Sequence, residues 1–427
     1  MIRRLARRPF VRNVAILSFG QTVAQGLAIA ASPLLTRLYS PDDFGLFGLL
    51  VALAGMMVVV SGLRYELAVV TAPDDQSAAD LLVLSCGIVV IVAGFTALIV
   101  GFGGGSIADL VDRPGLGDFL WWLPLLVLLG GTAQAFGYWT TRRKHFKRFA
   151  LSKVTRTLTS VAVQLTAGLS AAGAAGLIGG RAAGSFLAGT ILASRIWQDD
   201  RALVLSAIKG SRLVKAAKEN ARFPRYNAPH SLISSLSQVS VPYTLAAFFG
   251  VEIAGLYYLA ERVMRTPSVL VAGSVRRVFY QRASELYNQG KSFRKLLVST
   301  QSGLFLIGIA PLTVLVLFGP ELFSFVFGAD WNKAGVLAQW LVGWWFLSFM
   351  SGPALESLII LKLQKYLLYY QISIATARIL AILVGASLGD EILAVAACAL
   401  AGAVMNFGLI TCALVIVHRR SNPGTAN

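Results

Sequence analysis

Apolar stretches long enough to cross a lipid bilayer follow one another along most of the chain. A membrane-spanning helix needs roughly 20 mostly apolar residues, which matches the thickness of the hydrocarbon core. The pattern predicts about twelve such spans. They lie at about residues 11–38, 43–71, 77–101, 119–141, 150–172, 177–196, 230–250, 254–283, 294–318, 332–361, 366–387 and 391–417. We therefore predict an all-α integral membrane protein of about twelve transmembrane helices.

The composition agrees with this fold class. Hydrophobic residues make up 56% of the chain and charged residues only 14%, whereas soluble domains carry about 25% charged residues. Cys86, Cys398 and Cys412 fall inside predicted spans, which is typical of small buried apolar residues. The histidines are scattered and show no metal-ligand spacing. We expect no bound metal and no cofactor.

The net charge of +18 raises the question of a nucleic-acid partner, but the placement of the charge argues against one. If the amino terminus is cytoplasmic, the basic clusters all fall on the cytoplasmic side: 3–12, 142–153, 195–225, 276–295, 362–365 and 419–420. The opposite loops hold Arg113 and Lys333, with Arg37 at the rim. The positive-inside rule predicts this asymmetry. We therefore expect a multi-pass protein with both termini in the cytoplasm and no nucleic-acid partner.

A polar, basic segment near the middle divides the spans into two sets of six. It covers residues 197–229 and intersperses lysines and arginines with leucines and valines, a pattern typical of a helix on an anionic membrane surface. Gly45-Leu46-Phe47 and Gly255-Leu256-Tyr257 open the second span of each set, 210 residues apart. Such a repeat indicates two equivalent bundles in parallel orientation. We predict an N-terminal lobe at 1–196, a linker at 197–229 and a C-terminal lobe at 230–427.

Two glycine-rich stretches belong to this organisation. Glycines recur every three to five residues through 173–189, which predicts a face for close helix packing. Gly101 to Gly105 follow a span without a preceding strand, so we expect a flexible loop there and not a phosphate-binding turn.

Arginines within or at the edge of the spans carry the clearest functional signal. Each costs at least about 2.5–3.5 kcal/mol in hydrocarbon, so it needs a partner or a watery cavity. Guanidinium groups bind phosphate through paired hydrogen bonds and stay charged, so an arginine-lined path favours an anion. We predict that Arg37, Arg64, Arg262, Arg265 and Arg378 line a cationic cavity. Arg156 and Arg181 lie near span ends and are expected to extend to the membrane surface.

The neighbours of these arginines refine the prediction. Arg37 precedes Ser40-Pro41-Asp42-Asp43, which suits the start of a helix, and it either pairs with an aspartate or lies at the mouth of the cavity. Arg64 and Glu66, two apart, cannot pair on one helix, whereas Glu261 and Arg265, four apart, can.

Few acidic residues lie within the spans. Glu66, Glu261 and Glu356 are the candidates for ion coupling. A membrane enzyme needs acidic or histidine groups on a substantial outer loop, but the outer loops at about 102–118 and 319–331 are too short to form a domain. We predict no catalytic residues and no enzymatic activity.

Four segments resemble bacterial polysaccharide flippases of the Wzx type, in the multidrug/oligosaccharidyl-lipid/polysaccharide (MOP) exporter superfamily. They are Thr36 to Phe47, Leu63 to Ala68, Arg142 to Phe149 and Gly255 to Pro267. The resemblance implies two six-helix lobes around a central cationic cavity, and transport of a polyprenyl-pyrophosphate-linked oligosaccharide by alternating access. Arginines in the spans of these flippases are implicated in transport. Arg37, Arg64 and Arg262 lie in the matching motifs, whereas Arg265 and Arg378 rest on the charge argument alone.

The leading hypothesis is therefore a flippase of lipid-linked oligosaccharide in the bacterial inner membrane, acting in surface polysaccharide biosynthesis. Its expected partners are the lipid-linked oligosaccharide and membrane lipids, together with a polysaccharide polymerase and a chain-length regulator. Two alternatives stay open: a cation-coupled small-molecule exporter of the same superfamily, and a membrane-embedded glycan polymerase or ligase.

Overall fold

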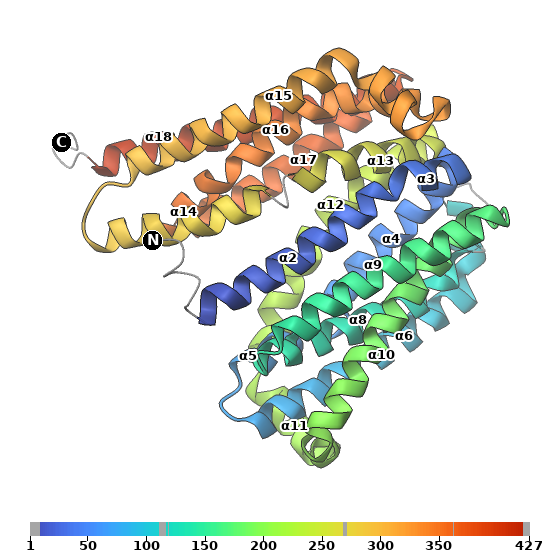
Figure 1. The fold of residues 1–427 in the computed structure, drawn as a ribbon, viewed down its shortest axis with the longest axis vertical. Coiled ribbons are helices and arrows are strands. Elements are labelled where there is room, and N and C mark those ends of the chain that lie inside the picture. The colour runs from blue at the N-terminus through green and yellow to red at the C-terminus, as the bar shows by residue number, and fades with distance from the viewer. Residues whose placement is uncertain (1–8, 111–116, 118, 268–270, 362, 422–427) are drawn as a thin grey trace. The chain divides into compact units, whose positions relative to one another are not determined.

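The computed structural model describes residues 9–110, 117, 119–267, 271–361 and 363–421. Over these ranges the backbone is helical almost throughout and contains no strand (Figure 1). The chain forms two compact units, residues 1–239 and 240–427, and each is described here by itself. The all-α prediction is confirmed.

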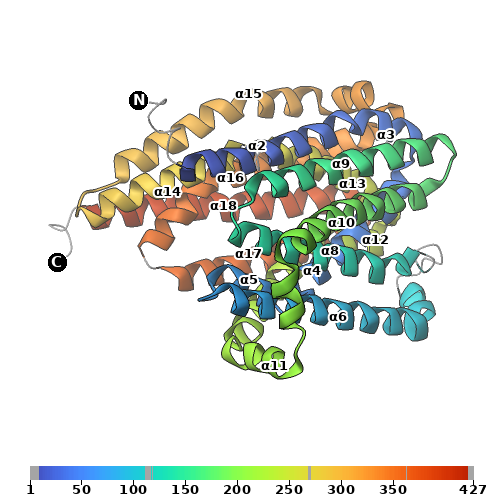
Figure 2. The same cartoon turned by 60° about the horizontal axis from the view of Figure 1, so that its bottom comes forward.

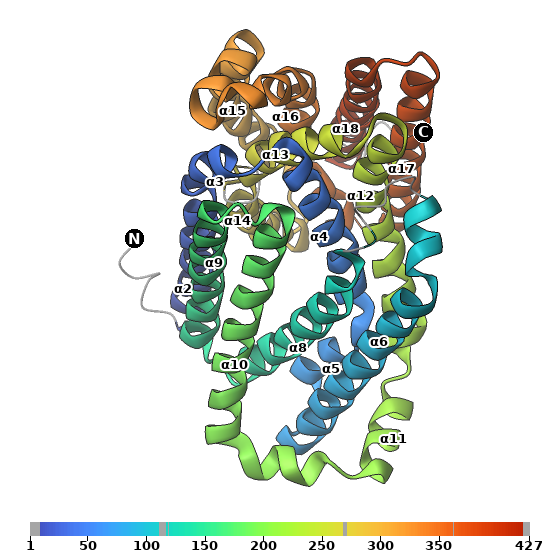
Figure 3. The ribbon, with the colours of Figure 1, turned by 90° about the vertical axis from the view of Figure 1, so that its right-hand side faces the viewer.

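The helices of unit 1 fall into a packed series. Helix α9 packs against α2 and α10, α10 packs against α8, and α8 packs against α4, α5 and α6. Figure 3 shows α2, α9, α10, α8 and α6 in that order across the unit. The bounds are α2 (Pro9–Ala30), α3 (Ser32–Leu38), α4 (Pro41–Ser61), α5 (Tyr65–Thr71), α6 (Asp75–Leu110), α8 (Trp122–Arg142), α9 (Phe146–Leu169), α10 (Gly173–Ala207), α11 (Gly210–Glu219) and the π-helical turn η1 (Phe223–Asn227).

Helix α12 (Ala228–Phe249) contains the boundary between the units. In unit 2, α16 packs between α15 and α18, and α17 packs on α18 (Figure 2). The bounds are α13 (Val251–Pro267), α14 (Gly273–Asn288), α15 (Arg294–Phe327), the 3₁₀ turn η3 (Ala329–Trp331), α16 (Asn332–Ile360), α17 (Gln364–Ser387) and α18 (Glu391–Ser421).

Eight helices in the part that the structure describes are long and apolar enough to cross a membrane. They are Pro41–Ser61, Asp75–Phe102, Gly173–Ala207, Phe223–Phe249, Arg294–Phe327, Ala329–Ile360, Tyr369–Ser387 and Glu391–Arg419. The other predicted spans are helical where the structure describes them, but α9 carries Lys147, Arg148, Lys153 and Arg156, and α14 contains three arginines. The contacts of these basic residues in α9 and α14 are therefore of particular interest.

Two predicted spans are broken within the described residues. The first divides at Ala31 into α2 and α3. The second breaks after α4, where Leu63 and Arg64 take left-handed backbone angles with φ of 49° and 64°. The expected loop at Gly101 to Gly105 is wrong, because α6 continues as helix to Leu110.

The predicted helix start at Ser40 is confirmed. The Asp43 backbone N–H donates to Ser40 Oγ at 3.2 Å, and the Ser40 backbone N–H donates to Asp43 Oδ2 at 3.0 Å. This reciprocal capping box satisfies donors that a helix start leaves unpaired. It begins α4 at Pro41 and so fixes where the second span enters unit 1.

The predicted glycine face is also confirmed, and it joins α9 to α10. A Cβ at Gly184 would lie 2.4 Å from the backbone oxygen of Arg156, and one at Gly180 would lie 2.8 Å from that of Ser160. The two helices are therefore close enough that backbone meets backbone, with no room for a methyl group.

We expect Gly184→Ala to destabilise unit 1 by about 1–3 kcal/mol, because the added methyl group must push α10 away from α9. The measurement is thermal unfolding of the purified protein. Gly189→Ala on the same helix is the matched control, since a Cβ there meets nothing within 4 Å, and better helix propensity should leave its stability equal or slightly higher. Equal melting temperatures for the two variants would contradict the close packing.

Candidate functional site

Three charged residues of unit 1 line a cavity of about 500 Å³ between α4, α8, α9 and α10. They are Lys153 and Arg156 from α9 and Arg181 from α10, and none of the described lining residues is a carboxylate. The volume is within the range of roughly 300–1,000 Å³ typical of small-molecule sites. The remaining lining residues are Val51, Ala54, Gly55, Val58, Leu126, Gly130, Ala133, Gln134, Gly137, Tyr138, Thr141, Phe149, Ser152, Ser185, Ala188 and Leu192.

Helical spacing explains why these side chains face one space. Phe149, Ser152, Lys153 and Arg156 follow one another at intervals of three, one and three residues, which places them on one face of α9. On α10, Arg181, Ser185, Ala188 and Leu192 follow at intervals of four, three and four residues and also share one face. The glycine contact between α9 and α10 sets the distance between these two faces.

The three cations are held differently. The Lys153 ammonium donates to Gln21 Oε1 at 2.7 Å and lies 4.8 Å from the centre of the Phe149 ring. Arg156 Nε is buried and has no hydrogen-bond partner within the described residues. Arg181 is close enough for its positive charge to act on Arg156. A buried donor without a partner is costly, so an acceptor oxygen at this position would stabilise Arg156.

The sequence prediction for Arg156 and Arg181 was wrong, because both side chains line this cavity. Their positions near predicted span ends suggested an extended, membrane-surface conformation. The signal that could have identified them was the spacing of Lys153 and Arg156, three residues apart on one face of α9.

Arg64 and Glu66 lie next to this cavity and form an ion pair, with Arg64 Nη1 3.4 Å from Glu66 Oε1. The prediction that they cannot pair was wrong, because it assumed a continuous helix. Arg64 precedes α5 in a left-handed conformation, so its side chain can turn back toward Glu66. Glu66 is buried, and Gln134 Nε2 donates to its Oε1 at 2.8 Å. Since Gln134 lines the cavity, this carboxylate is one hydrogen bond away from it.

In unit 2, Arg378 lies among side chains from three other helices. Its guanidinium carbon is 4.1 Å from the centre of the Trp344 ring, a cation–π distance. The Tyr257 hydroxyl and the Cys398 thiol interact with the same group, and the charge of Glu261 acts on it. The structure therefore gives Arg378 partners that sequence reasoning missed, and the charge of the predicted residue Glu261 acts on it.

The remaining candidates are placed as follows. Arg262 is half-buried on α13, while Arg265 on the same helix and Arg37 at the end of α3 are exposed. The predicted pair of Glu261 and Arg265 is absent from the ion pairs within 4 Å in the described part of the chain, although their charges interact. Glu356 is buried and pairs with Arg276 of α14. It stays a prediction that one cavity is lined by Arg37, Arg64, Arg262, Arg265 and Arg378.

Comparison with solved structures identifies the fold. The inward closed conformation of the lipid II flippase MurJ aligns with a TM-score of 0.69 and 12% identity, covering 95% of this chain and 90% of that one. An inward-facing multidrug resistance MATE transporter of the MOP superfamily aligns with a TM-score of 0.66 and 11% identity, covering 97% and 99%. A MOP transporter from Pyrococcus furiosus, described as having a binding pocket of reverse polarity, aligns with a TM-score of 0.60 and 12% identity, covering 96% of both chains. The fold is that of MOP superfamily transporters.

The family follows from the sequence match. Residues 34–336 match the family described as polysaccharide biosynthesis protein. The chain belongs to this family of polysaccharide biosynthesis proteins. None of the curated proteins compared with it matches by sequence.

Proposed function

We propose that the protein flips a polyprenyl-pyrophosphate-linked oligosaccharide across the bacterial inner membrane by alternating access, for surface polysaccharide biosynthesis. The observation that carries the proposal is the cavity of unit 1, whose charged lining residues are all cationic. Family membership supports a substrate from polysaccharide synthesis. The fold shared with a lipid II flippase supports a lipid-linked one.

The chemistry of the cavity suits a pyrophosphate or an acidic sugar. Arginine presents several N–H donors in a fixed fork that matches phosphate and carboxylate oxygens. An anionic oxygen beside Arg156 would supply the partner that its Nε lacks and would reduce the repulsion from Arg181. Tyr138, Thr141 and Ser185 line the same cavity and offer hydroxyl groups to a sugar.

The other arginines enter the proposal as further contacts. We assign Arg37, Arg64, Arg262, Arg265 and Arg378 to the substrate path, and Glu66, Glu261 and Glu356 to ion coupling. The lobes at 1–196 and 230–427, joined by the linker at 197–229, are the parts proposed to move. We place both termini in the cytoplasm, with a polysaccharide polymerase and a chain-length regulator as functional partners.

An exporter of cationic small molecules is the main competitor, since a multidrug transporter shares the fold. The charge of the cavity argues against it, because three cations and no carboxylate would repel a cationic drug. An anionic substrate agrees with the same lining.

Deletion of the gene tests the function in cells. We expect lipid-linked repeat units to accumulate on the cytoplasmic face, because the sugar cannot cross an apolar bilayer unaided. Face-specific labelling of the lipid-linked sugar in intact and inverted vesicles is the measurement. Accumulation on the outer face would indicate a polymerase or ligase. Normal surface glycan with increased drug sensitivity would indicate a small-molecule exporter.

A further inference from the structure

Helix α11 has two chemically different faces. On the shielded face Ala216 is buried and Arg212, Leu213 and Ala217 are half-buried, whereas Val214, Lys215 and Lys218 on the opposite face are exposed. These exposed positions are one, three and four residues apart, so they form one stripe along the helix. The stripe combines an apolar side chain with two lysines, and the other helices of unit 1 leave it exposed.

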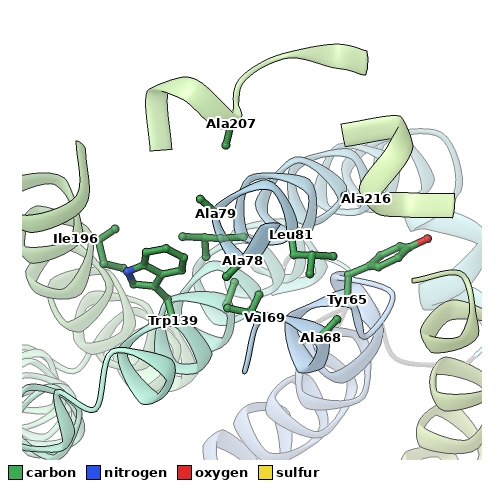
Figure 4. Close-up of a cluster of buried hydrophobic side chains, with 12 residues drawn as sticks. Tyr65, Ala68, Val69, Ala78, Ala79, Leu81, Trp139, Ile196, Ala207 and Ala216 are labelled. Atoms are coloured by element: carbon green, nitrogen blue, oxygen red, sulfur yellow. The ribbon is translucent and has the colours of Figure 1, made fainter. Parts of the chain in front are cut away.

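The shielded face is firmly attached to the helices beside it. Arg212 Nε donates to Asp80 Oδ2 of α6 at 3.1 Å, and the Tyr65 hydroxyl of α5 donates to the Ala217 carbonyl oxygen at 3.1 Å. Ala216 belongs to the buried cluster that also contains Tyr65 and Leu81 (Figure 4). Helix α11 is therefore part of unit 1, and its exposed face has a defined orientation.

Exposed residues also lie directly before α11. Ile208 is 60% exposed and Val214 within the helix 55% exposed, and Lys209, Lys215 and Lys218 are exposed as well. Glu219 is the only acidic residue from 201 to 226, and it lies 3.8 Å from Lys215. We call Ile208, Lys209, Val214, Lys215 and Lys218 the α11 surface.

We propose that the α11 surface binds anionic phospholipid headgroups of the surrounding bilayer. Cations interleaved with exposed apolar side chains match a membrane interface, where ammonium groups meet phosphates and apolar groups enter the acyl boundary. The apolar side chains distinguish this surface from one built for a soluble polyanion, since Ile208 and Val214 would gain nothing there.

The contacts of α11 connect this surface to the cavity of unit 1. Tyr65, which bonds to Ala217, lies between Arg64 and Glu66. Glu66 accepts a hydrogen bond from Gln134, which lines the cavity. Anionic lipid on the α11 surface stabilises the docked helix, and with it the turn that positions Glu66. The lipid therefore raises transport activity. Only this last step rests on the proposed function; the binding of lipid to the α11 surface does not.

The binding step is tested without transport. The full-length Val214→Cys protein is labelled with an environment-sensitive dye and placed in nanodiscs of neutral lipid, or of neutral lipid with about 30% phosphatidylglycerol. We expect acrylamide to quench the dye at least about fivefold less in the anionic nanodiscs. Protein with Val214 intact, labelled in parallel, gives the background from native cysteines.

Charge variants identify the residues responsible. Lys209→Gln, Lys215→Gln and Lys218→Gln together should abolish the difference between the two lipids. The matched control, Lys291→Gln, Arg294→Gln and Lys295→Gln, removes the same charge from exposed residues of unit 2 and should leave the difference intact. Equal quenching in both lipids, whether strong or weak, would overturn the proposal, as would loss of the difference in the control variant.

The link to the cavity has its own test. Tyr65→Phe removes the hydrogen bond to Ala217 and keeps the ring. We expect the dye to stay shielded in this variant, while anionic lipid no longer raises transport activity. A Tyr65→Phe protein with full lipid stimulation would overturn the link. If no lipid-linked oligosaccharide is transported at all, the proposed function fails while the quenching result still stands.

Discussion

Replacement of both Arg156 and Arg181 with methionine is expected to reduce export of surface glycan at least about 100-fold. A hydrogen bond to a charged group contributes about 1.5–3 kcal/mol, and the double variant removes two guanidinium groups from a cavity with no competing carboxylate. Methionine has a long apolar side chain that fills similar space. The measurement is surface glycan in a deletion strain that expresses the variant.

Charge-conserving variants serve as the control for this prediction. Lysine at both positions keeps the positive charge but loses the fork of donors, so we expect an intermediate loss of about tenfold. Arg294→Met is the matched single control, because Arg294 is an exposed arginine of unit 2. Export at the normal level by the methionine variant, with normal protein abundance, would remove the unit 1 cavity from the substrate path.

Neutralisation of Glu66 by Glu66→Gln is expected to reduce transport at least about tenfold and to abolish its dependence on a proton gradient. The glutamine keeps the shape and one acceptor for Gln134, but it cannot gain or lose a proton. It also leaves the Arg64 charge without its partner. Loss of one member of a buried pair costs up to about 3–5 kcal/mol, so the melting temperature should fall as well.

A double variant separates coupling from stability. Arg64→Gln added to Glu66→Gln removes both charges, so we expect the melting temperature to recover while transport stays low. If transport recovers together with stability, Glu66 holds the turn between α4 and α5 and does not couple an ion. Transport assays at two proton gradients and thermal unfolding of the same preparations distinguish these outcomes.

Local features of the chain were predictable because they depend on residues close in sequence. The apolar stretches predicted the helices, and Ser40 to Asp43 predicted the start of α4. The glycines at 180 and 184 predicted close packing, although the partner helix α9 could not be inferred from spacing alone.

The site was harder to predict because its contacts join distant residues. A continuous helix through 43–71 made the Arg64–Glu66 pair look impossible, and the break arises from backbone angles that no apolar pattern reveals. The partners of Arg378 lie at 257, 344 and 398 and meet only when four helices pack. Arg156 and Arg181 line the same cavity because α9 packs closely on α10.

The central claim is that the cationic cavity of unit 1 carries the anionic part of a lipid-linked sugar across the bilayer. The most direct measurement is flipping of a labelled polyprenyl-pyrophosphate oligosaccharide by purified protein in liposomes, detected as protection of the label from an added glycosidase. We expect time-dependent protection with the wild-type protein and almost none with the Arg156→Met, Arg181→Met variant. Equal protection by the two proteins, or none by the wild type, would contradict the central claim.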